Sequence, residues 1–315
     1  MTRHLLDVTD LTADEVREVL DLAEAPIADL GRPLEGLGAA LVFEKPSTRT
    51  RHSMEMAVVQ LGGHPVHTRA DEVGLDVREP VEDVTRILAG YHEVIAARVF
   101  DHGVLTRMAA ALDGAHDDAI VVNMLSDVSH PLQALADALT MRRHLGSLEG
   151  RTVAYVGDYA NVARSLAEIS LLLGMRVRLA SPTGYGPDDG ELDRLAMIGG
   201  GDVVAHARPH DAVEGADAVH TDTWVSMGQE ADAEVRRRAF EGWTVDEAMM
   251  AAADDAAIFL HCLPAYRGSE VTAEVIDGPR SVVIEQGHDR MHAARGALAF
   301  LRRARTGAGD GASTP

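Results

Sequence analysis

Short runs of apolar residues alternate along the chain with longer stretches in which apolar residues recur every three or four positions. The runs predict buried strands, at residues 39–43, 94–99, 120–125, 152–156, 177–180, 203–206, 218–221, 258–261 and 282–284. The longer stretches predict helices, among them residues 49–60, 104–112, 130–144, 162–173 and 288–305. Strands that alternate with helices favour an α/β fold with parallel sheets covered on both faces. Because the alternation restarts after Gly150, we expect two such Rossmann-like domains, a number that 315 residues can supply.

Composition excludes several classes of protein. The formal net charge of −21 argues against a nucleic-acid-binding protein, which usually carries a basic surface. No apolar run approaches the roughly 18 residues that a membrane helix needs, and the first residues lack the pattern of a signal peptide, so we expect a cytoplasmic protein. Cys262 is the only cysteine, which rules out an intrachain disulfide and a multi-cysteine zinc site. The glycine-rich dinucleotide and P-loop fingerprints are absent from the sequence.

A cluster of hydroxyl and guanidinium groups follows the first predicted strand, in Ser47-Thr48-Arg49-Thr50-Arg51. It opens a predicted helix, where free N–H groups and the positive end of the helix dipole favour an anion. An arginine there can hold two phosphate oxygens at once. The alternative is an ordinary helix N-cap with surface arginines.

His130 and Gln133 begin the long predicted helix after the strand at residues 120–125. Residues three apart share a helix face, so both side chains can reach one ligand. A histidine that only caps the helix remains the alternative.

Two further motifs follow strands of the second predicted sheet. The first, Asp222 to Gly228, offers a carboxylate for a cationic amine and backbone donors near Ser226 and Met227 for a carboxylate; a loop capped by Asp222 is the alternative. The second is His261-Cys262-Leu263-Pro264, where a buried free cysteine is the alternative. A Cys–His nucleophile is disfavoured, because neighbours on a strand point to opposite faces.

Together and in this order, these motifs resemble the aspartate/ornithine carbamoyltransferase family, from about residue 40 to residue 300. Ser226-Met227-Gly228 and His261-Cys262-Leu263-Pro264 resemble its ornithine branch in particular. The resemblance implies a carbamoyl-phosphate-binding domain, residues 1–146, with a C-terminal helix, residues 287–305, that returns to it. It also implies an ornithine-binding domain, residues 147–286; residues 306–315 are expected to form a flexible tail.

The resemblance also implies a role for individual residues. Carbamoyl phosphate would be bound by Ser47, Thr48, Arg49, Thr50, Arg98, His130, Gln133, Cys262, Leu263 and Arg290. Arg98, His130, Cys262 and Arg290 would take part in catalysis, and Asn161, Asp222, Ser226 and Met227 would hold L-ornithine. The implied reaction transfers a carbamoyl group to the δ-amine of ornithine, giving citrulline in arginine metabolism, without a metal or organic cofactor. The implied assembly is a homotrimer or an assembly of trimers.

One segment departs from the family pattern. Where relatives often carry Gln or His before Leu-Gly, this chain has Gly74-Leu75-Asp76. The missing side chain would reach the phosphate of a neighbouring subunit, and Arg78 is a candidate substitute. Putrescine, an N-acylated ornithine such as N-acetylornithine, and aspartate are alternative substrates. Asp222 and the motif that follows argue against them, because an acylated nitrogen gains nothing from a carboxylate partner. A non-catalytic anion-binding protein on the same fold is a further alternative.

Overall fold

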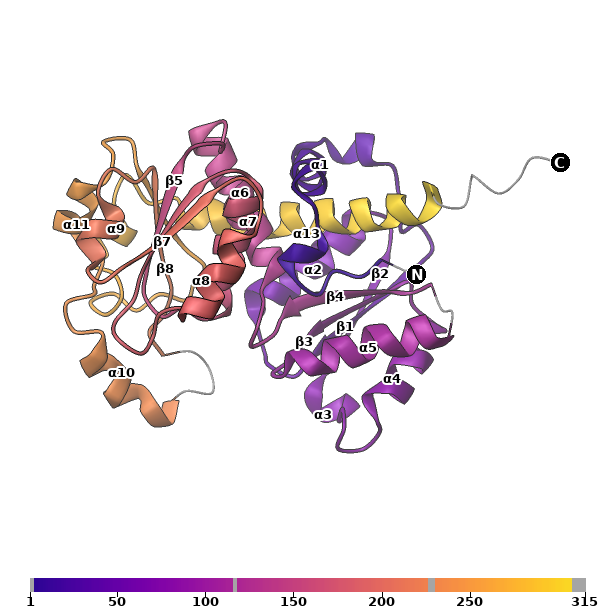
Figure 1. The fold of residues 1–315 in the computed structure, drawn as a ribbon. Coiled ribbons are helices and arrows are strands. Elements are labelled where there is room, and N and C mark those ends of the chain that lie inside the picture. Colours follow the sequence, from indigo (N-terminus) through magenta and orange to yellow (C-terminus); the bar gives the residue numbers. More distant parts are fainter. Residues whose placement is uncertain (1–2, 116–117, 226–229, 308–315) are drawn as a thin grey trace. The chain divides into compact units, whose positions relative to one another are not determined.

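The computed structural model describes residues 3–115, 118–225 and 230–307. The chain forms two compact units, residues 1–136 with 290–315 and residues 137–289 (Figure 1). The divisions between these units lie inside two helices, α6 (Pro131–Leu145) and α13 (Val283–Gly307). The apolar pattern and the resemblance place the domain boundaries at residues 146 and 287 instead.

The first unit contains a four-stranded parallel sheet in the order β2-β1-β3-β4. Its strands are β1 (Gly38–Phe43), β2 (His64–Arg69), β3 (Val94–Arg98) and β4 (Ile120–Leu125). Its helices are α1 (Ala13–Glu24), α2 (Thr48–Gln60), α3 (Ala70–Val73), α4 (Val81–Ala89) and α5 (His102–Ala115), with 3₁₀ turns at Val8–Asp10 and Ile27–Leu30. Buried aliphatic side chains of β1, β3, α4 and α5 form a core on one face of the sheet. Both faces of β3 are buried, as expected for a central parallel strand.

Strand β2 is absent from the sequence-based expectations. Its sequence, His-Pro-Val-His-Thr-Arg, is polar, and none of its residues is buried. It pairs only with β1, at the edge of the sheet. An edge strand tolerates proline and polar side chains, and its apolar pattern is therefore weak.

The second unit contains a five-stranded parallel sheet in the order β7-β6-β5-β8-β9. Its strands are β5 (Thr152–Val156), β6 (Arg176–Ala180), β7 (Asp202–His206), β8 (Ala218–Thr221) and β9 (Ile258–His261). Its helices are α7 (Asn161–Leu172), α8 (Asp189–Ala196), α9 (Pro209–Val213), α10 (Ala233–Ala239), α11 (Glu247–Ala252) and α12 (Ala273–Ile276), with a 3₁₀ turn at Glu230–Asp232. Residues of β5, β8, β9, α11 and α12 share one hydrophobic core. The two parallel sheets confirm the α/β class.

The strand expected at residues 282–284 is wrong. Val282 donates its N–H to the Phe259 carbonyl at 3.0 Å, and α13 begins at the next residue. Val282 and Val283 are buried while Ile284 is 59% exposed. An apolar run of three residues cannot distinguish a short strand from the first turn of a helix, and here it belongs mainly to the helix.

The C-terminal part of α13 belongs to the first unit, as expected from the resemblance. Arg295 donates to the Ala23 carbonyl at the end of α1 (2.8 Å) and to the Gln60 side chain at the end of α2 (3.0 Å). A Cβ on Gly296 would lie 2.4 Å from the Val19 carbonyl oxygen, so glycine permits the close approach of α13 to α1.

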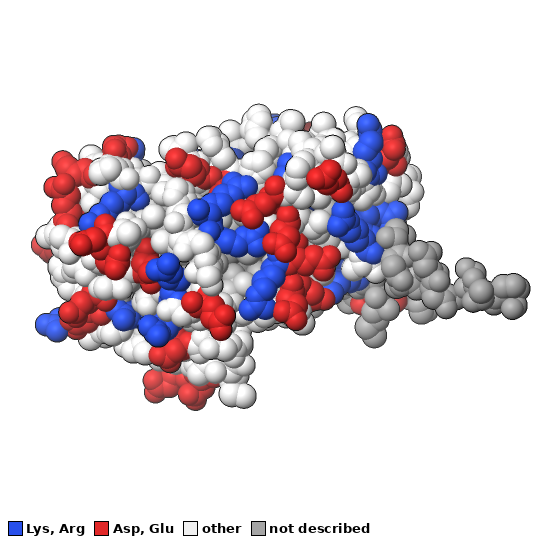
Figure 2. Space-filling model, turned by 90° about the horizontal axis from the view of Figure 1, so that it is seen from above, with Lys and Arg blue, Asp and Glu red and all other residues white. Residues whose placement is uncertain are grey.

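Charged side chains of both signs are interspersed on the face drawn in Figure 2. Among the described residues, no helix has both the length and the apolar character needed to cross a membrane.

Candidate active site

The hydroxyl cluster of the first unit lies where the strand order reverses. The chain leaves β1 toward β2 on one side and later adds β3 and β4 on the other, so the carboxyl ends of β1 and β3 form a topological switch point. Open α/β sheets bind ligands at such a point. Ser47 to Thr50 follow β1, and Arg98 is the last residue of β3.

Ser47 caps α2. Its hydroxyl accepts from the Thr50 N–H at 3.4 Å, and the two hydroxyl oxygens are 3.1 Å apart. Thr48 is exposed and Arg49 half-buried in the first turn of the helix, whereas Thr50 is buried. Ser47 is therefore an N-cap residue, and the segment also presents hydroxyl groups and a helix N-terminus at the switch point; the anion site stays a prediction.

Two buried arginines converge on Thr50. Arg98 donates to its hydroxyl oxygen at 3.2 Å, and Arg290, in the first third of α13, donates to the same oxygen at 2.7 Å. Arg290 also donates to the Gln133 side-chain oxygen at 2.6 Å. Residues distant in sequence are thus gathered around one neutral hydroxyl, and two positive charges at one point suit a phosphate group.

His130 is 3% exposed at the start of α6. Burial lowers the pKa of His130 well below its usual 6.5, and the positive charges of Arg290 and Arg98 lower this pKa further. The imidazole is therefore neutral near pH 7 and keeps one N–H to donate. These two causes also show that His130 lies within the electrostatic reach of both arginines.

The second unit has its own switch point, between β5 and β8. Asn161 opens α7 shortly after β5, and Asp222 directly follows β8. Both side chains are half-buried. The Asn161 side-chain oxygen accepts from the Val162 N–H at 3.0 Å, and Asp222 accepts from the Thr223 N–H at 2.8 Å.

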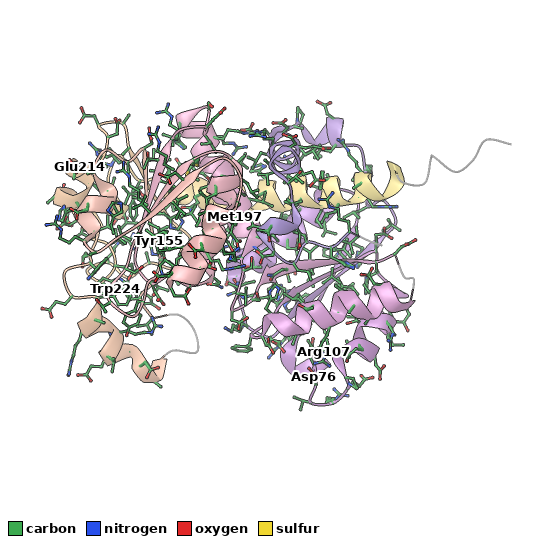
Figure 3. The ribbon with its side chains drawn as sticks, in the orientation of Figure 1. Asp76, Arg107, Tyr155, Met197, Glu214 and Trp224 are labelled. Atoms are coloured by element: carbon green, nitrogen blue, oxygen red, sulfur yellow. The ribbon has the colours of Figure 1, made fainter. Side chains whose placement is uncertain are left out.

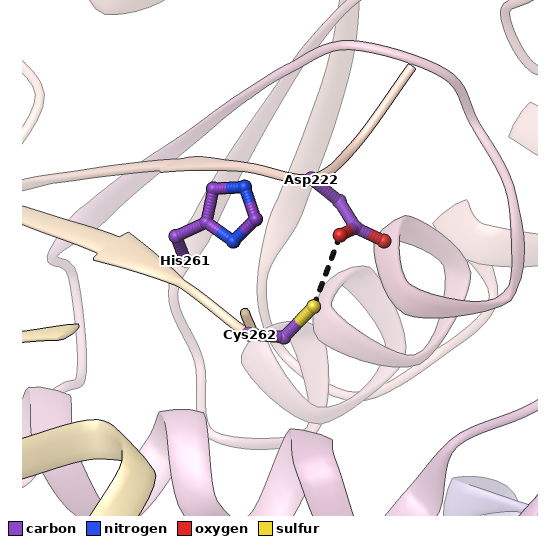
Figure 4. A group of neighbouring side chains, drawn as sticks. All are labelled: Asp222, His261 and Cys262. Carbon is purple, nitrogen blue, oxygen red and sulfur yellow. Dashed lines mark hydrogen bonds between the residues drawn. The ribbon is translucent and has the colours of Figure 1, made fainter. Parts of the chain in front are cut away.

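Cys262 follows β9, the strand next to β8. Its thiol donates a hydrogen bond to an Asp222 carboxylate oxygen at 3.0 Å (Figure 4). Leu263 has a positive φ of 56° and is joined to Pro264 by a cis peptide bond. Its side chain packs against the core of the second unit.

Strand alternation predicts that the side chains of His261 and Cys262 point to opposite faces, but the structure brings them to the same side. Ligand atoms of Asp222, His261 and Cys262 lie within 4.8 Å of one another (Figure 4). The strand ends at His261, and the alternation does not extend to the next residue.

Both ring nitrogens of His261 are nevertheless engaged. Nδ1 accepts from the Leu263 N–H at 2.9 Å, and Nε2 lies 3.3 Å from a carboxylate oxygen of the buried Glu270. A metal ligand or general base needs an available ring nitrogen. This arrangement therefore supports neither a metal centre at this cluster nor a Cys–His nucleophile.

An arginine that sequence reasoning missed joins the two loops of this site. Arg236 of α10 donates to the Asp158 carboxylate (2.7 Å) and to the Trp224 carbonyl (3.0 Å). Asp158 precedes Asn161 by three residues, and Trp224, labelled in Figure 3, follows Asp222 by two. Burial raises the pKa of Asp158, and the bond from Arg236 opposes that shift. The expected contacts of Ser226 and Met227 lie outside the described residues.

The Gly74 segment forms a tight turn in the first unit. Gly74 has a φ of +59°, and a Cβ at this position would lie 2.9 Å from the Arg78 side chain. Arg78 donates to the Glu72 carbonyl at 3.2 Å. Asp76 pairs with Arg107 of α5 at 2.7 Å, and both are labelled in Figure 3. Arg78 therefore lies over the turn in place of a residue-74 side chain.

Two family models match the chain over almost its whole length. The carbamoyl-P binding domain of aspartate/ornithine carbamoyltransferase matches residues 3–143, and the Asp/Orn binding domain matches residues 149–301. The chain belongs to this family.

Individual family members are similar over the full chain. An ornithine carbamoyltransferase from Acidothermus cellulolyticus is 46% identical, and the match covers 98% of this chain and 99% of the relative. The crystal structure of ornithine carbamoyltransferase from Thermus thermophilus has a TM-score of 0.85 at 42% identity, with 96% of this chain and 99% of that chain covered. The Pyrococcus furiosus ornithine carbamoyltransferase has a TM-score of 0.88 at 41% identity, with coverages of 95% and 96%.

Proposed function

We propose that this chain transfers the carbamoyl group of carbamoyl phosphate to the δ-amine of L-ornithine, giving L-citrulline and phosphate in arginine metabolism. The observation that carries this proposal is the match of the chain, at 46% identity and nearly full coverage, to an ornithine carbamoyltransferase. The side chains at both switch points support it, because each suits one of the two substrates.

The first unit binds carbamoyl phosphate. The phosphate lies at the N-terminus of α2, where Ser47, Thr48, Arg49 and Thr50 supply N–H groups, hydroxyl groups and a guanidinium. Arg98 and Arg290 now share the Thr50 hydroxyl, and a phosphate oxygen of the ligand offers these arginines a charged acceptor instead. Charge-assisted bonds of this kind are about twice as strong as neutral ones.

His130 and Gln133 hold the carbamoyl group. His130 is neutral because of its lowered pKa, so it adds a hydrogen-bond donor without a third positive charge. Gln133 already accepts from Arg290, which fixes the orientation of its amide. Its NH₂ group is then directed away from the arginine.

The second unit binds ornithine. Asp222 pairs with the α-ammonium group, while Asn161 and the backbone of Ser226 and Met227 hold the α-carboxylate. Cys262 and Leu263 contact the carbamoyl NH₂ group and the incoming amine. The thiol already donates to Asp222, which supports a role in positioning rather than in nucleophilic attack.

Transfer is direct in this scheme. The neutral δ-amine attacks the carbamoyl carbon, and negative charge develops on the carbonyl oxygen. Donors from Arg98, His130 and Arg290 stabilise that charge, which is usually the largest single contribution to catalysis. The C–O bond to phosphate then breaks, and the departing phosphate takes the amine proton. No step requires a metal, an organic cofactor or a covalent enzyme intermediate.

A carbamoyltransferase for putrescine or N-acetylornithine is the second candidate. Putrescine lacks the α-carboxylate, and acetylation removes the positive charge that Asp222 would pair with. In either case polar groups of the second unit are left without partners, which weakens binding. The half-buried Asp222 carboxylate therefore favours ornithine over N-acetylornithine, while the groups assigned to the α-carboxylate favour ornithine over putrescine.

We also propose that the chain forms a homotrimer or an assembly of trimers, as the resemblance implies. Gly74 cannot contribute a side chain to a neighbouring subunit. Arg78, which lies over Gly74, is the nearest cationic candidate for that contact.

The test is stoichiometric. Purified protein is incubated with carbamoyl phosphate and ornithine, and citrulline and phosphate are measured in parallel. Equal amounts of both products, with phosphate release falling to the spontaneous rate when ornithine is omitted, are expected. Phosphate release that does not depend on ornithine would show hydrolysis rather than transfer. The variant Asp222→Asn should lower citrulline formation at subsaturating ornithine, because it removes the carboxylate that is proposed to pair with the α-ammonium group.

A further inference from the structure

We propose that Gln286 is a positioning residue for the ornithine side of the site, and this proposal rests on the function proposed above. Gln286 belongs to the first turns of α13, within the second unit, and is fully buried. Neither the motifs nor the proposed mechanism assigns it a role.

Both ends of the Gln286 amide are used. Its oxygen accepts from the backbone N–H of His261 at 2.8 Å, and its NH₂ group donates to a carboxylate oxygen of Asp137 at 2.6 Å. The same nitrogen lies 3.3 Å from His220 Nε2, which in turn lies 3.5 Å from the second Asp137 oxygen. All four residues are at most 1% exposed. Buried polar groups of this kind are costly to leave unsatisfied, so the arrangement has little freedom to shift.

These bonds hold the two strand ends that carry the proposed ornithine contacts. His261 ends β9 and is followed by Cys262, while His220 of β8 precedes Asp222 by two residues. His220 is further fixed by stacking on Tyr155, with ring centroids 5.8 Å apart. Gln286 and Asp137 therefore link the strand ends from which Cys262 and Asp222 meet at 3.0 Å.

The donor and acceptor pattern requires an amide that faces a carboxylate at these two positions. A leucine at residue 286 removes both bonds and leaves the His261 N–H and one Asp137 oxygen without this partner. The exchanged pair Gln286→Glu with Asp137→Asn keeps both bonds: the new carboxylate accepts from His261 and from the new amide. Function should therefore follow the hydrogen-bond pattern rather than the identity of residue 286.

Because Cys262 is the only cysteine, its reaction with a chromogenic disulfide reports on this site without any turnover. A thiol beside a carboxylate is disfavoured as a thiolate, and the thiolate is the reactive form. Gln286→Leu should increase the reaction rate at pH 8 by at least about threefold and raise KM for ornithine by at least about tenfold. KM for carbamoyl phosphate should stay within about twofold, because its proposed ligands lie mainly in the first unit.

The double variant should return the thiol reaction rate and the ornithine KM to within about twofold of the wild type. The control is Gln60→Leu in the first unit, which also loses amide hydrogen bonds, to Met291 and Arg295, and should leave the rate of the Cys262 thiol reaction unchanged.

A folded Gln286→Leu variant with wild-type thiol rate and ornithine KM would overturn the proposal. If Gln286→Leu does not fold, the double variant decides: a folded double variant with altered thiol rate and ornithine KM would also overturn it. If the wild type does not carbamoylate ornithine, the proposed function fails, and the thiol reaction still tests the positioning role.

Discussion

The thiol of Cys262 and the carboxylate of Asp222 are joined by a hydrogen bond of 3.0 Å, although 39 residues separate them in the chain. Their strands, β9 and β8, are neighbours in the sheet. The bond makes Asp222 the partner of Cys262, while both nitrogens of His261 are directed to other groups. A thiol that donates to a carboxylate is poorly suited to act as a nucleophile.

Cys262→Ser should therefore retain activity, because a serine hydroxyl can still donate to Asp222. Cys262→Ala removes the donor, and a hydrogen bond to a charged group contributes about 1.5–3 kcal/mol. We expect roughly tenfold or greater loss of kcat/KM for ornithine in the alanine variant and a smaller loss in the serine variant. Steady-state kinetics measure this difference. Intact mass spectra recorded during wild-type turnover should show no carbamoyl adduct on Cys262; such an adduct would contradict direct transfer.

Arg98→Ala should greatly reduce turnover without unfolding the chain. Truncating one partner of a buried charged interaction costs about 2–5 kcal/mol, so kcat/KM should fall by at least roughly 30-fold. Arg107→Ala is the control, because Arg107 pairs with Asp76 and Glu82 on the surface of the first unit, away from the switch point. Equal kcat/KM values in the two variants would contradict the role given to Arg98. Arg49→Ala should also lower kcat/KM without unfolding the chain, although Arg49 is only half-buried.

Loss of stability toward acid should depend on His130. Its pKa in the folded chain lies below the usual 6.5, so the unfolded chain binds more protons once the pH falls below about 6.5. The contribution of His130 to the free energy of unfolding is therefore complete above that pH and decreases below it. His130→Gln does not titrate and should lose less stability between pH 7.5 and pH 5.5 than the wild type. Urea unfolding at both pH values measures this, with the exposed His52→Gln as control; an unchanged pH dependence in His130→Gln would count against a neutral buried imidazole.

Gly74→Gln should destabilise the chain. Gly74 adopts a left-handed backbone conformation, and its Cβ would meet the Arg78 side chain at 2.9 Å. That conformation costs an ordinary residue about 1–2 kcal/mol, and asparagine tolerates it better. In urea unfolding, the free energy of unfolding should therefore be highest for the wild type, lower for Gly74→Asn and lowest for Gly74→Gln. If the intersubunit contact exists, the KM for carbamoyl phosphate in Gly74→Gln will be lower or unchanged; a higher KM in a trimeric variant would show that the turn has another role.

The buried strands were predictable because their apolar runs are nearly unbroken, as in β3 and β5, which are buried along their whole length. Edge strand β2 could not be predicted from the sequence, because its polar residues and Pro65 give no periodic apolar pattern. The run at residues 282–284 was misread because three apolar residues fit a strand as well as the start of α13. Local patterning thus reports burial well and edges or element boundaries poorly.

For the site, the sequence identified the residues that follow strands, since parallel sheets bring the carboxyl ends of their strands to one edge. It could not show that Arg98 and Arg290 share the Thr50 hydroxyl, because that contact joins β3, α2 and α13. Gln286 and Arg236 were also missed: their roles depend on tertiary hydrogen bonds, and neither lies in a recognisable motif. Strand alternation failed at Cys262 because the strand ends one residue earlier.

Substrate selectivity tests the central claim most directly. The kcat/KM for carbamoylation should be measured with ornithine, putrescine, N-acetylornithine and aspartate at saturating carbamoyl phosphate. A site built around polar partners rejects an analogue that lacks them by factors of about 10⁴. We predict that ornithine exceeds each of the other amines by several orders of magnitude, and that Asp222→Asn narrows the gap to N-acetylornithine, which lacks the positive charge that Asp222 would pair with. Comparable kcat/KM values for putrescine and ornithine in the wild-type protein would contradict the account.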